Sequence, residues 1–128
     1  MQANFRTPLA RARGLGSAKE GVTHWWRQRL TAMALIPLTL IMAGYILSLV
    51  GADRATVVAT LQEPFPALVA LLLIVAAFWH VKLGGQVIIE DYVHAHGAKI
   101  AAIIALNFAC VVVGLASALA VLRLFFGG

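Results

Sequence analysis

The chain has 128 residues, of which 62% are hydrophobic and 12% are charged, and its mean hydropathy is +0.91. A soluble domain of this size is not so apolar, so the composition predicts an all-α integral membrane protein. The net charge of +5 does not indicate nucleic-acid binding, because the basic residues cluster where membrane topology alone would place them.

Residues 1–29 form a basic N-terminal arm. The arm lacks the continuous apolar core of a cleaved signal peptide. Pro8 and the glycines up to Gly21 are expected to break any long helix in its first part. Trp25 and Trp26 stand immediately before the first apolar run, where paired Trp side chains are typical of an interfacial anchor.

Three apolar segments are long enough to cross a membrane as helices, which takes about 20 residues each. We place the spans at residues 30–50, 67–89 and 100–122. The remaining segments are then an outer loop at 51–66, a cytoplasmic loop at 90–99 and an outer tail at 123–128. Only the second span contains a charged residue, Lys82, which we expect to extend along the face opposite His80 toward the cytoplasmic boundary.

The distribution of Lys and Arg predicts the orientation of these spans. Six basic residues precede the first span: Arg6, Arg11, Arg13, Lys19, Arg27 and Arg29. Lys99 lies in the 90–99 loop, whereas the outer loop contains only Arg54 and the tail only Arg123. Because cytoplasmic loops carry an excess of Lys and Arg, we place the N-terminus in the cytoplasm and the C-terminus on the outer, periplasmic side.

The third span carries two rows of small residues at helical spacing. One row is Ala101, Ala105 and Ala109, and the other is Cys110, Gly114 and Ala118. Small rows let helices approach closely, and two rows suit a helix that touches more than one neighbour. Cys110 is expected to be a buried structural thiol. Since three helices form a thin bundle, we also expect a companion membrane subunit.

His80 is the most informative residue, because an ionisable side chain deep in a membrane span needs a partner or a ligand. By helical spacing, His80, Gly84, Val87 and Asp91 share one stripe that runs to the end of the second span. His80 is interpreted either as a histidine hydrogen-bonded to a neighbouring helix or as an axial ligand of haem iron. In the second case, Gly84 and Gly85 would leave room for the flat macrocycle, and the other axial ligand would come from another subunit.

Asp91 and Tyr92 end the second span. They are interpreted either as ordinary interfacial residues or as a quinone site, in which the phenol donates a hydrogen bond to a carbonyl oxygen and the carboxylate relays protons. Glu90 points about 100° away from Asp91 and is expected to be solvated. His94 and His96 lie in the loop and are expected to be exposed.

Two arginines precede the first span. Arg29 stands next to the uncharged run and could pair with an anionic group such as a haem propionate. Arg27 is interpreted as a topology residue only. In the third span, Asn107 is expected to hydrogen-bond across helices.

Together these residues resemble the hydrophobic membrane anchor subunit of succinate dehydrogenase, in the smaller of its two anchor types. The resemblance covers nearly the whole chain. It rests on Gly-Leu-Gly-Ser-Ala at 14–18 with Gly21-Val22, Arg29-x-Thr31-Ala32 at the first span, and His80 with Asp91-Tyr92 in the second.

The resemblance implies that His80 is an axial ligand of haem b, shared with a histidine of the companion cytochrome b anchor subunit. It implies that Tyr92 hydrogen-bonds a ubiquinone carbonyl, that Asp91 lines the same pocket, and that Arg29 lies near the haem propionates and the quinone. His24 lies where some family members have a histidine near the propionates.

The resemblance further implies a four-subunit complex in the bacterial inner membrane, with a flavoprotein that oxidises succinate and an iron–sulfur subunit. This chain would do no succinate chemistry itself. Two alternatives are a small proton-conducting or transporter subunit, with His80, Lys82 and Asp91 as a proton path, and a cofactor-free structural anchor. Against the first, His80 and Lys82 face different ways.

Overall fold

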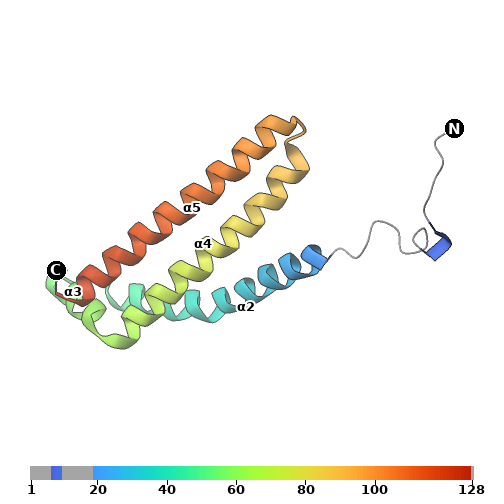
Figure 1. Ribbon diagram of the computed structural model, residues 1–128. Helices are drawn as coiled ribbons and strands as arrows, with labels where there is room; N and C mark the ends of the chain where they lie inside the picture. Colours follow the sequence, from blue (N-terminus) through green and yellow to red (C-terminus); the bar gives the residue numbers. More distant parts are fainter. Residues whose placement is uncertain (1–6, 10–18, 128) are drawn as a thin grey trace.

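The computed structural model describes residues 7–9 and 19–127, so the Gly-rich motif at 14–18 lies outside the described residues. The main elements of this part of the chain are the helices α2 (Lys19–Ser48), α3 (Arg54–Gln62), α4 (Pro64–Tyr92) and α5 (His96–Phe125), labelled in Figure 1, and the described residues include no strand. Helices α2, α4 and α5 are long and apolar enough to cross a membrane. The predicted fold class is confirmed, and the orientation of the termini stays a prediction.

The prediction that Gly21 would help to break any long helix in the first part of the N-terminal arm was wrong. Helix α2 begins at Lys19, contains Gly21, and continues without interruption through Pro37. Glycine inside a helix costs about 1 kcal/mol relative to alanine. Such a cost is small for a helix of 30 residues that is continuous with an apolar span.

Helix α3 was not predicted, since residues 51–66 were interpreted as a loop. Its N-cap is Asp53, whose Oδ1 accepts a hydrogen bond from the backbone N–H of Thr56 at 3.0 Å. The Thr56 hydroxyl also donates to this carboxylate, and these bonds hold the pKa of Asp53 below its usual value. The next helix follows directly, with Pro64 at its start, where a missing N–H is tolerated.

Helix α4 is the centre of the molecule. It packs against α2 on one side and α5 on the other, while α3 contacts both α4 and α5 (Figure 1). The turn between α4 and α5 is held by Lys99, whose Nζ donates to the carbonyl of Glu90 at 2.9 Å. His94 and His96 are exposed beside this turn, as predicted.

The best-buried residues lie near the start of α4, where α3 covers it. They are Pro66, Ala67, Val69 and Ala70, with Leu83 further along the helix and Cys110 on α5. On α5, Gly114 faces α4, because a Cβ built there would lie 3.3 Å from the Phe78 ring. At the other end of the molecule α2 diverges from α4 (Figure 1), and the candidate site lies where this divergence begins.

Candidate functional site

His80 lies on α4 where that helix crosses α2. Its Nδ1 is 3.0 Å from the hydroxyl of Thr31, and its Nε2 is 3.5 Å from the side-chain nitrogen of Gln28. Both ring nitrogens therefore face α2, and the half-buried ring lies between the two helices. These contacts match the alternative interpretation of His80 as a histidine hydrogen-bonded to a neighbouring helix, and its role as a haem ligand stays a prediction.

Gly84 and Gly85 face different helices. A Cβ at Gly84 would lie 3.3 Å from the Gln28 nitrogen, so Gly84 faces α2 beside His80. A Cβ at Gly85 would lie 2.8 Å from Leu106 of α5, closer than real Cβ atoms approach. The prediction that Gly85 widens the space beside His80 was wrong, because one residue further along a helix is a turn of about 100°. Gly85 instead lets α4 and α5 pack closely.

Two buried polar atoms lie without a hydrogen-bond partner on the α2 side of this crossing. They are Nε2 of His24 and Oε1 of Gln28, one turn apart on the same face. Buried polar atoms in folded proteins nearly always have a partner. In the described residues, the same is true of Oδ1 of Asn107, so the cross-helix bond predicted for that side chain is not made by its oxygen. The face of α2 beside His80 thus offers polar groups that nothing in the described part of this chain satisfies.

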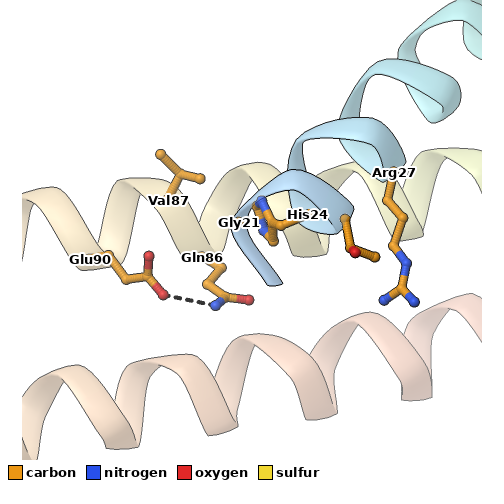
Figure 2. A pocket seen from close by; sticks show the side chains of 7 residues that line it. Gly21, His24, Arg27, Gln86, Val87 and Glu90 are labelled. Carbon is orange, nitrogen blue, oxygen red and sulfur yellow. Dashed lines mark hydrogen bonds between the residues drawn. The ribbon is translucent and has the colours of Figure 1, made fainter. Parts of the chain in front are cut away.

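A cleft of about 600 Å³ opens where α2 and α4 diverge. It is lined by Gly21, Thr23, His24 and Arg27 of α2 and by Gln86, Val87 and Glu90 of α4. Figure 2 shows Arg27 and Glu90 at its two ends with His24 between them. Gln86 donates a hydrogen bond to Oε1 of Glu90 at 2.8 Å. The cleft therefore presents a cation, an anion and an imidazole to whatever enters it.

Of the two arginines that precede the first span, the structure places Arg27 in the cleft and not Arg29, which the sequence favoured as the binding residue. Both arginines are exposed, but Arg27 lines the cleft, whereas the guanidinium carbon of Arg29 lies 5.4 Å from the centre of the Trp25 ring. At that distance a cation is attracted to the face of the ring. Sequence reasoning did not identify Arg27, Gln86 and Glu90 as cleft residues, or Gln28 as a contact of His80. The signal was helical spacing, since His24, Gln28 and Thr31 share one face of α2.

Asp91 and Tyr92 are both exposed at the end of α4, and the Tyr92 side chain is 77% accessible. Neither lines the cleft; the acidic residue that does is Glu90, which is also exposed. Lys82 lies on the α5 side of α4, away from His80 as predicted, in an apolar groove with Trp79. Asp91 and Tyr92, which are predicted to bind the quinone, therefore do not lie around His80. They lie at the exposed C-terminal end of α4.

The chain matches the model of a known family over residues 3–114, described as the succinate dehydrogenase/fumarate reductase transmembrane subunit. Proteins named succinate dehydrogenase hydrophobic membrane anchor subunit, from Rickettsia bellii and Paracoccus denitrificans, are each 32% identical. These matches cover 84% and 88% of this chain and 86% and 87% of the two relatives. The succinate dehydrogenase membrane anchor subunit of Reclinomonas americana is 35% identical over 66% of this chain and 73% of its own length. No solved structure matches the chain significantly.

Proposed function

The chain belongs to the succinate dehydrogenase/fumarate reductase transmembrane subunit family, and we propose that it is a hydrophobic membrane anchor subunit of a succinate dehydrogenase. Relatives that match most of this chain carry that name, and the described residues include three helices able to span a membrane. In this role it binds the iron–sulfur subunit and the flavoprotein to the inner membrane, and the flavoprotein alone oxidises succinate.

Exposed helix faces made of small residues, on α2 and α5, support a companion cytochrome b anchor subunit as the membrane partner. Ala101, Ala105 and Ala109 form an exposed row on α5, on a different face from the Cys110 row that packs on α4. A Cβ added to Gly44 of α2 would meet no atom of the described residues within 4 Å. Because close packing drives helix association in lipid, these faces suit helices of a second chain.

The position of His80 supports a haem b shared with that companion. A half-buried imidazole in a membrane span provides a nitrogen ligand, and Gly84 one turn away adds no side chain of its own to that helix face, against which Gln28 of α2 lies. The unpartnered Nε2 of His24 can donate a hydrogen bond to a propionate on the same face, whereas the unpartnered Oε1 of Gln28 is an acceptor and needs a donor from another chain. Binding at Nε2 requires the Gln28 amide, which contacts it at 3.5 Å, to rotate away. Haem b, when bound, supplies one-electron transfer.

We propose that Tyr92 and Asp91 form this chain's part of a ubiquinone-reduction site. The Tyr92 phenol donates a hydrogen bond to a quinone carbonyl, and Asp91 passes protons to the oxygens as they gain electrons. Both side chains are exposed here, so the companion and iron–sulfur subunits must supply the other walls of the pocket. Arg29, and Arg27 in the cleft, provide positive charge for the propionates or the quinone at the same end of the molecule.

The observation that carries this proposal is the match of the chain, over most of its length, to named anchor subunits. The test is affinity purification through a tag on this chain. The purified material should contain four subunits, should oxidise succinate with an artificial acceptor, and should show a b-type haem band on reduction. A preparation without succinate oxidation would contradict the anchor role. A complex that oxidises succinate but contains no haem would favour a cofactor-free anchor.

A further inference from the structure

The hydroxyl of Thr31 stands within hydrogen-bond distance of three groups. It is 2.9 Å from the carbonyl oxygen of Arg27, 3.0 Å from that of Gln28 and 3.0 Å from Nδ1 of His80. Threonine has one hydroxyl proton and can accept further hydrogen bonds with its oxygen. The carbonyls can only accept. When the Thr31 proton goes to its own helix, the hydroxyl oxygen must therefore accept the bond from Nδ1–H of His80.

We propose that Thr31 is a positioning residue that fixes His80 in the tautomer with the proton on Nδ1. The lone pair of Nε2 can then bind a metal once the Gln28 amide that contacts it rotates away. The hydrogen bond made by one ring nitrogen of a histidine decides which of the two nitrogens carries the proton. This inference rests on the proposed haem role of His80, but it concerns a residue of α2 that does not touch the iron.

The contact at the other ring nitrogen agrees with this tautomer. Nε2 of His80 is 3.5 Å from the side-chain nitrogen of Gln28, which is a donor only. With the proton on Nδ1, Nε2 is an acceptor and the contact is favourable. With the proton on Nε2, two donors would face each other, and Thr31 would give up both backbone carbonyls to donate to Nδ1.

The arrangement has two consequences for a ligand imidazole. The Thr31 hydroxyl is held by its own helix turn, so it restrains rotation of the ring about its Cβ–Cγ bond. An oxygen that accepts from Nδ1–H also raises the basicity of Nε2, as the outer partners of metal-bound histidines do. Removal of the hydroxyl should therefore loosen haem binding and stabilise the oxidised iron less.

The test uses three variants in the assembled complex. Thr31→Val removes the hydroxyl at nearly constant volume, and Thr31→Ser keeps it. Thr39→Val is the matched control, because the Thr39 hydroxyl makes the same backbone bonds, to Leu35 and Ile36, from an exposed position. The readouts are the rate of haem release to an apo-globin acceptor and the midpoint potential of the haem.

Thr31→Val should release haem about 10–100-fold faster than the unmodified complex, the usual effect of losing such an outer partner, and should raise the midpoint potential. Thr31→Ser and Thr39→Val should behave like the unmodified complex. If Thr31→Val fails to assemble, Thr31→Ala replaces it, since the smaller side chain cannot clash.

Haem release and potential unchanged in the hydroxyl-free variant would overturn the role of Thr31 while leaving haem ligation by His80 intact. An equal defect in Thr31→Ser would also overturn it, since it would point to the lost methyl group. Absence of haem from the unmodified complex would instead contradict the proposed function itself.

Discussion

At the residue scale, His80 links α4 to α2 through its contacts with Thr31 and Gln28. The depth of an imidazole in an apolar run predicted a functional residue, because burial of such a group is costly without a partner. The identity of its partners, Thr31 and Gln28, depends on where α2 crosses α4. The crossing point is a tertiary property, which no periodicity within one helix defines.

Tyr92→Phe removes one hydroxyl and little volume, so it tests hydrogen bonding to the quinone. If the phenol polarises the carbonyl as negative charge develops, quinone reduction should slow by about one to three powers of ten. Asp91→Asn should give a milder defect that depends on pH. The measurement is succinate–quinone activity per assembled complex, with an artificial acceptor at the soluble subunits as the control. Normal turnover at both limiting and saturating quinone would place the quinone elsewhere.

Variants of Arg27 and Arg29 compare a positive charge that lines the cleft with one that does not. The sequence alone predicted a larger effect at Arg29, but Arg27 lines the cleft and Arg29 stacks on Trp25. We now expect Arg27→Ala to slow quinone reduction or loosen haem at least as much as Arg29→Ala, by about tenfold for one lost charged hydrogen bond. Arg54→Ala, at the exposed start of α3, is the control. Equal, wild-type behaviour of all three variants would mean that these charges act only in topology.

At the scale of elements, the spans were predictable because uncharged runs of that length have few other structures available. The small row at Cys110 and Gly114 was correctly predicted to be a packing face. Helix α3 was missed because its short sequence lacks a strong apolar period, and the cap at Asp53 was its clearest signal. The cleft could not be predicted, because it arises from the divergence of α2 from α4.

Gly85→Ala tests the close approach of α4 and α5. The added Cβ would lie 2.8 Å from Leu106, so that side chain must move, at a cost of about 1–3 kcal/mol. Gly97→Ala is the control, because a Cβ there would meet no atom of the described part of the chain within 4 Å. The measurement is thermal stability of the purified complex. The assignment of Gly85 to the α4–α5 contact would be wrong if both variants melted at the unmodified temperature.

At the scale of the whole molecule, the chain is built around α4 and leaves α2 and α5 largely uncovered. Of the most apolar window in each helix, 22% of residues are buried in α4, 6% in α5 and none in α2. Lipid can cover apolar side chains, but it cannot satisfy the buried polar atoms of His24 and Gln28. Three helices form only a thin bundle, and the structure thus supports the expectation that other chains complete the site.

One comparison tests both proposed roles of this chain, the anchoring of a succinate dehydrogenase and the ligation of a haem through His80. The most direct measurement is the electron paramagnetic resonance spectrum of the complex purified through this chain, compared between the unmodified protein and His80→Ala. We predict a low-spin haem signal in the unmodified complex that is lost or shifted in His80→Ala, with succinate oxidation by an artificial acceptor retained. An identical low-spin signal in both preparations, or no haem signal in either, would contradict the ligation of a haem through His80.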